Sequence, residues 1–182
     1  MSLALLALAA LTVINPARVR SALPQRDHVL VGALGAALAW LLLVPTVVAA
    51  HVLLDQVDIA ASTLRMGVGV LLLLQGAAVA LAAPPQTEPG LPGRRAALVP
   101  VAFPVTLTPG LGGLAVSASF DHPAHLALAI LALALVTIPG LALVWSGESP
   151  VRTRVLTAVG RATGALLLVS GVALLMNGVF DI

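Results

Sequence analysis

Cysteine, tyrosine and lysine are all missing from this chain of 182 residues, and aromatic residues make up only 3% of it. Without cysteine there is no disulfide, no thiolate metal ligand and no cysteine nucleophile. All nine basic residues are therefore arginine, and the formal net charge is only +2. No basic patch is interleaved with aromatic side chains, so we expect no nucleic-acid partner.

Charged residues are also scarce, at 9%, whereas hydrophobic residues make up 60%. A soluble globular domain has about 25% charged and about 45–50% apolar residues. The composition therefore predicts a polytopic membrane protein, surrounded by lipid, with no room for a separate soluble module. The apolar stretches contain no pair of carboxylates and no cluster of histidines. We therefore expect no enzymatic activity, no metal site and no cofactor.

Six apolar stretches are each close to the roughly 20 residues that cross about 30 Å of hydrocarbon. They predict an all-α protein with six transmembrane helices, at approximately Ser2–Ser21, His28–His51, Ile59–Ala83, Ala96–Phe120, Pro123–Ser146 and Val155–Val179. The longest connection, residues 84–95, is rich in proline and glycine. We interpret it as a cytoplasmic linker between two three-helix halves, residues 1–83 and 96–182.

The arginines predict how the chain is oriented in the membrane. The loops after the first, third and fifth stretches contain Arg18, Arg20, Arg26, Arg94, Arg95, Arg152 and Arg154. The other loops and the C-terminal tail contain no arginine, and they carry Asp55, Asp58, Asp121 and Asp181. By the positive-inside rule the arginine loops are cytoplasmic, so both termini lie outside the cell.

Because each half has an odd number of spans, the second half crosses the membrane in the opposite sense to the first, as in an inverted repeat. The segment Ile14–Ala17 corresponds to Leu107–Gly110 in the second half. The third and sixth stretches each carry two glycines seven residues apart, which are Gly69 with Gly76 and Gly164 with Gly171. Small residues at that spacing lie on one helix face and allow close helix packing.

Proline interrupts two of the apolar stretches, and these interruptions predict the functional site. The first lies at Asn15-Pro16 and the second at Thr108-Pro109-Gly110, so we expect the first and fourth transmembrane helices to be broken there. Unpaired backbone groups are costly in hydrocarbon, so such a break must face protein or a water-filled cavity. Secondary transporters build substrate sites from broken helices. The candidate substrate-binding residues are Asn15, Pro16, Thr108, Pro109, Gly110, Thr12, Thr106, Gly112 and Arg65.

Most of these residues also have a purely structural interpretation. Asn15 could bind solute or cap the helix that begins at Pro16. The hydroxyls of Thr12, Thr106 and Ser117 could line the site or return a hydrogen bond to the backbone one turn earlier. Arg65 could clamp a carboxylate, or it could pair with Asp58 or reach the membrane surface. The same structural alternatives apply to Arg161, and for Gln75 we expect an interhelical hydrogen bond.

Four segments resemble the MarC family of six-span inner-membrane proteins, part of the LysE-like exporter superfamily. They are the Asn-Pro of the first stretch, DIAASTLRMGVGVLLLL, LVPVAFPVTLTPGLGG and RVLTAVGRATGALLLVSGVALLMNGVFDI. The chain departs from the family pattern where Ala17-Arg18 follow the Asn-Pro, because the family usually has a glycine there. The resemblance implies a transporter fold in the plasma membrane of a prokaryote. Some relatives are described as carriers of small neutral amino acids.

The expected function is therefore a secondary carrier, an exporter of a small polar solute such as a neutral amino acid. The alternative is a membrane protein that does not transport, such as an assembly partner or a lipid-handling protein. No aspartate or glutamate lies within the six stretches, so a facilitator or a sodium-coupled carrier is expected rather than a carboxylate proton relay. The oligomeric state stays open, with a homo-oligomer among the alternatives.

Overall fold

The computed structural model describes residues 1–23, 27–81, 93–144 and 150–180. These residues form seven α-helices and two short helical segments, with no β-strand among them, so the all-α class is confirmed. The elements are α1 (Leu3–Val13), α2 (Pro16–Ala22), α3 (His28–Val57), α4 (Ala61–Leu81), η1 (Gly93–Ala97), η2 (Leu98–Thr106), α5 (Pro109–Asp121), α6 (Ala124–Val144) and α7 (Pro150–Phe180).

Within the described ranges, five spans are long and apolar enough to cross a membrane, namely Leu3–Ala22, His28–Ala50, Ala61–Leu81, Ala124–Leu141 and Arg154–Phe180. A sixth arises if Gly93–Thr106 and Pro109–Asp121 are taken as one span, bent by 69°. Large apolar side chains point outward from these helices, including Leu41, Leu74 and Leu133, which are 63%, 64% and 64% exposed. An apolar outer surface of this kind suits contact with lipid rather than water.

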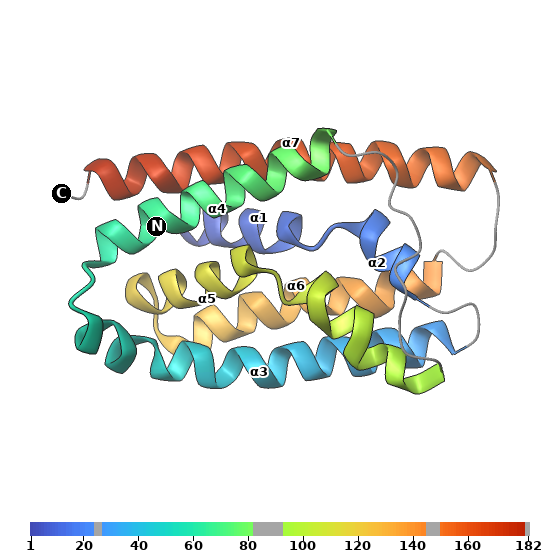
Figure 1. Ribbon diagram of the computed structural model, residues 1–182, viewed down its shortest axis with the longest axis horizontal. Helices are drawn as coiled ribbons and strands as arrows, with labels where there is room; N and C mark the ends of the chain where they lie inside the picture. The colour runs from blue at the N-terminus through green and yellow to red at the C-terminus, as the bar shows by residue number, and fades with distance from the viewer. Residues whose placement is uncertain (24–26, 82–92, 145–149, 181–182) are drawn as a thin grey trace.

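The helices form three layers (Figure 1). The long helices α4 and α7 pack against each other on one side, and α3 packs against α6 on the other. Between them lie α1, α2 and α5, which contact both pairs. The buried core fills the space between the layers, and its largest fully buried side chains include Leu6, Leu43, Leu72, Leu111, Leu114 and Leu131.

Glycines bring α4 and α7 close together. A Cβ atom placed on Gly69 would lie 2.9 Å from the Gly171 carbonyl oxygen, and one placed on Gly76 would lie 2.9 Å from the Gly164 carbonyl oxygen. Any larger residue would press on main-chain atoms there. The four glycines that the sequence places on one face of their helices therefore form the contact between α4 and α7, as small residues do between membrane helices.

Helix α3 continues past His51, the expected end, to Val57. Asp58 then stops it in the left-handed region, at φ 52°, with its N–H donating to the Leu54 carbonyl. Helix α7 begins at Pro150 rather than Val155. Most of the predicted linker lies outside the described residues, and Gly93–Arg95 belong to η1.

Candidate functional site

The first interruption lies between α1 and α2. Helix α1 ends at Val13, Ile14 and Asn15 are extended, at ψ 96° and 116°, and α2 begins at Pro16. The N–H of the first helical residue has no partner within the helix, so a proline, which lacks this N–H, loses no hydrogen bond at that position. The Asn15 side-chain oxygen accepts hydrogen bonds from the amides of Ala17 (2.8 Å) and Arg18 (3.3 Å). Asn15 therefore caps α2, which is one of its two expected roles.

The second interruption, between η2 and α5, repeats this chemistry. Leu107 and Thr108 depart from helical geometry, at ψ 76° and 155°, and α5 begins at Pro109. The Thr108 hydroxyl oxygen accepts from the Leu111 amide at 3.2 Å, and the Thr108 carbonyl accepts from the Gly112 amide at 3.0 Å. Both interruptions thus consist of an extended residue, a capping side chain and a proline at the first helical position.

The two neighbouring threonines use their hydroxyls within their own segments. The hydroxyl of Thr12 donates to the Leu8 carbonyl at 2.7 Å. The hydroxyl of Thr106 donates to the Val101 carbonyl at the same distance. Both threonines are buried. Both hydroxyls therefore donate to the backbone, as the structural alternative for these threonines expects.

Gln75, in the C-terminal half of α4, contacts both interruptions. Its side-chain nitrogen donates to the Val13 carbonyl, 62 residues away, at 3.2 Å. A Cβ atom placed on Gly110 would lie only 2.5 Å from the Gln75 side-chain oxygen. The expected interhelical hydrogen bond of Gln75 is confirmed. The amide therefore lies between the C-terminal end of α1 and the first turn of α5.

Helix α7 covers the first interruption from another side. A Cβ atom placed on Gly160 would lie 3.3 Å from the Asn15 side-chain oxygen and 3.1 Å from the Ala17 Cβ atom. A glycine at this position lets the α7 backbone approach the Asn15 cap. Asn15 itself is only 8% exposed, and Ile14 is 2% exposed. The break is therefore enclosed by protein.

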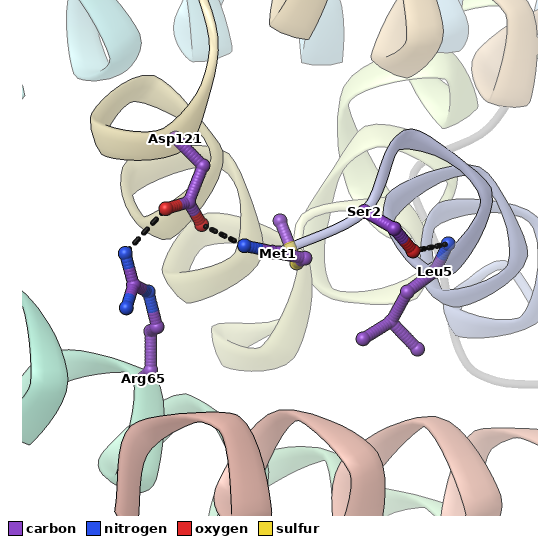
Figure 2. A network of polar contacts seen from close by, with 5 residues as sticks. All are labelled: Met1, Ser2, Leu5, Arg65 and Asp121. Carbon is purple, nitrogen blue, oxygen red and sulfur yellow. Dashed lines mark hydrogen bonds and ion pairs between the residues drawn. The ribbon is translucent and has the colours of Figure 1, made fainter. Parts of the chain in front are cut away.

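Arg65 does not lie with the other candidate residues. It precedes Gln75 by ten positions on α4, which is about 15 Å along a helix axis. Its guanidinium pairs with the carboxylate of Asp121, which also pairs with the Met1 ammonium at 3.1 Å (Figure 2). The Arg65 and Asp121 side chains are 12% and 9% exposed. The structure therefore shows Arg65 in an ion pair, which is one of its expected roles.

The ion-pair partner of Arg65 is Asp121, and not Asp58, the partner considered from the sequence. Asp58 is exposed at the end of α3, whereas Asp121 is the last residue of α5, which packs on α4. Asp121 comes directly after the expected end of the fourth span at Phe120, so the sequence placed it in a loop. Arg161, the other arginine within a span, is exposed on α7.

The described residues contain no group of three or more histidine, aspartate or glutamate side chains that could hold a metal ion. A model of the MarC family of integral membrane proteins matches residues 7–182, nearly the whole chain. No curated protein and no solved structure matches the chain.

Proposed function

The chain belongs to the MarC family of integral membrane proteins, and we propose that it is a secondary carrier that exports a small polar solute such as a neutral amino acid. The solute site is formed where the two interrupted helices meet beside Gln75. The carrier lies in the plasma membrane of a prokaryote with both termini outside.

The observation that carries this proposal is the position of the Gln75 amide between two helix ends of opposite polarity. A helix has a partial negative charge at its C-terminal end and a partial positive charge at its N-terminal end. The Gln75 N–H group faces the Val13 carbonyl at the end of α1, and its oxygen faces Gly110 in the first turn of α5. A neutral amino acid matches this pair of ends, with its ammonium toward Val13 and its carboxylate toward α5.

The contact between α4 and α7 supports an inverted repeat. In the predicted correspondence Gly69 matches Gly164, and Gly76 matches Gly171. Gly69 contacts Gly171, and Gly76 contacts Gly164. A two-fold axis produces this reciprocal pattern, because each contact is repeated with the two halves exchanged. Other contacts follow the same exchange, in which α1 corresponds to η2, α2 to α5 and α3 to α6. The contact of α1 with α6 corresponds to that of η2 with α3, and the contact of α2 with η2 corresponds to that of α5 with α1.

The two halves differ in one respect that suits alternating access. α1 and α2 together make one span of 20 residues, Leu3–Ala22, whereas η2 and α5 meet at a bend of 69°. Carriers with inverted repeats change access by moving one half against the other around a fixed site. We expect the opposite-facing state to arise when α1 and α2 bend and η2 and α5 straighten.

One observation favours the alternative, a membrane protein without transport. The caps formed by Asn15 and Thr108, and the bond from Gln75 to Val13, satisfy several of the groups that the breaks release. A scaffold would need the same bonds. Flux separates the two functions, because only a carrier moves solute across a membrane.

The experiment is uptake of labelled alanine by proteoliposomes, with imposed proton or sodium gradients. We expect saturable flux from the wild-type protein. Flux that responds to neither gradient indicates a facilitator, and flux that follows sodium indicates a sodium-coupled carrier. Absence of flux with alanine and a panel of other small polar solutes would contradict the carrier proposal.

Two variants of Asn15 separate binding from capping. Asn15→Ser keeps a capping oxygen but removes the amide nitrogen, whereas Asn15→Ala removes both. If the amide contacts solute, Asn15→Ser loses flux while its thermal stability stays near that of the wild type.

At the second break, Thr108→Ser keeps the cap and Thr108→Val removes it. We expect Thr108→Val to lose flux and Thr108→Ser to keep it.

A further inference from the structure

One face of α5 packs along α4 over the whole length of the helix. Gly110 lies against Gln75 and Leu72, and a Cβ atom placed on Gly113 would lie 2.9 Å from a methyl carbon of Val68. At the far end of the same face, Asp121 pairs with Arg65. Residues three, seven and eleven positions after Gly110 share its helix face.

Ser117 lies on this face, four residues after Gly113 and four before Asp121. It is 1% exposed, and its hydroxyl oxygen is covered but has no hydrogen-bond partner in the described part of the chain. Other buried hydroxyls of the bundle return a bond to their own helix. Ser119 donates to the Val116 carbonyl at 2.7 Å, and Ser170 donates to the Leu166 carbonyl at 3.0 Å.

An unpaired hydroxyl in a buried helix interface is unusual, because burial removes its bonds to water without replacing them. The interface has polar groups at both of its ends, the Gln75 amide at one and the Arg65–Asp121 ion pair at the other. Gly110, Gly113 and Ser117 are also all small residues. Together they would leave room for a small solute once the helices separate.

We propose that the α4–α5 interface is the path by which solute passes between Gln75 and the end of the protein where Asp121 lies, and that the Ser117 hydroxyl binds the solute on the way. This inference rests on the proposed carrier function. The interface is closed in this structure. It opens when α5 moves away from α4, which separates Asp121 from Arg65, while the glycine contacts keep α4 on α7.

The absence of cysteine from the chain makes a direct test available. Ser117→Cys introduces a single thiol of nearly the same size into the full-length protein. The purified variant is reconstituted in proteoliposomes and treated with a small, charged methanethiosulfonate reagent, and modification is scored by mass spectrometry. Ser170→Cys is the matched control, because Ser170 is 0% exposed and lies on α7.

We expect the reagent to modify Ser117→Cys during transport, to stop most of its alanine flux, and to act more slowly when alanine is in excess. Ser170→Cys should stay unmodified and keep its flux. If Ser117→Cys transports alanine but reacts no faster than Ser170→Cys, the proposed path is wrong and the carrier function stands. If the wild-type protein moves no solute, the carrier function itself fails.

A second variant covers the case in which Ser117→Cys does not fold. In Arg65→Cys/Asp121→Cys, a bis-methanethiosulfonate reagent that spans the length of the former Arg65–Asp121 contact joins α4 to α5 at the end of the interface. We expect this cross-link to block flux and a reductant, which cleaves it, to restore flux. Undiminished flux through the cross-linked protein would overturn the proposed path.

Discussion

Asn15 and Thr108 each stand directly before a proline that opens a helix, and each caps that helix with its own side chain. A capping residue followed by proline is a local signal, so both helix starts could be predicted from four or five residues of sequence. The hydrogen bond from Gln75 to Val13 and the ion pair from Arg65 to Asp121 join residues far apart in the chain. Their partners depend on how the helices pack, which no local pattern encodes.

Arg65→Gln tests the buried ion pair. The variant leaves the Asp121 carboxylate, 9% exposed, without the guanidinium. Removing one partner of a buried pair costs about 3–5 kcal/mol of unfolding free energy. We expect a clear loss of stability in detergent, measured by thermal unfolding. The double variant Arg65→Met/Asp121→Leu should not recover it, because it leaves the buried Met1 ammonium without its carboxylate. Equal stability of Arg65→Gln and the wild type would show that the pair contributes little.

At the scale of helices, the α4–α7 contact could be predicted in kind but not in detail. The seven-residue spacing of Gly69 and Gly76 identifies a close-packed face. It does not say that Gly69 meets Gly171 rather than Gly164, its counterpart in the predicted repeat. That pairing follows from the antiparallel arrangement of α4 and α7. Likewise, α3 continues to Val57 and α7 begins at Pro150, beyond the apolar stretches from which the helix bounds were predicted.

Gly76→Ala tests this contact, with Gly67→Ala as its control on the same helix. The added methyl at position 76 would lie 2.9 Å from both the Gly164 carbonyl oxygen and the Leu168 amide nitrogen, which are main-chain atoms. Overpacking of this kind costs about 1–3 kcal/mol. At Gly67 nothing lies within 4 Å. We expect thermal unfolding at a lower temperature for Gly76→Ala only, and equal midpoints for the two variants would contradict the close contact.

For the whole molecule, the described arginines of α2, η1 and the start of α7 lie toward one end of the bundle. Asp121 and the start of α1 lie at the other (Figure 1). The sequence predicted this separation of charge, because each helix crosses the bundle once and the loops alternate between its ends. The sequence also predicted the membrane class and the family, because composition and the family's motifs do not depend on how the helices pack.

Cysteine labelling tests the orientation in intact cells. Gln56 and Arg94 are both exposed. Gln56 lies in the last turn of α3 and Arg94 lies in η1, and these two segments are at opposite ends of the bundle (Figure 1). An impermeant thiol reagent should label Gln56→Cys from outside, and it should label Arg94→Cys only after the membrane is opened. The reverse pattern would place the arginines outside the cell.

The central claim is that the two interrupted helices form a solute site with Gln75 between them. Its most direct test is the KM for alanine uptake by proteoliposomes that contain the wild type, Gln75→Met or Leu74→Met. Methionine keeps the length of the side chain without the amide, and Leu74 points outward, 64% exposed. In the proposed site the Gln75 amide, which lies between the two helix ends, also bonds the solute's charged groups. A lost hydrogen bond to a charged group is worth about 1.5–3 kcal/mol, so we predict a KM roughly tenfold or more higher for Gln75→Met. Leu74→Met should keep the wild-type value, and an unchanged KM in Gln75→Met would contradict the claim.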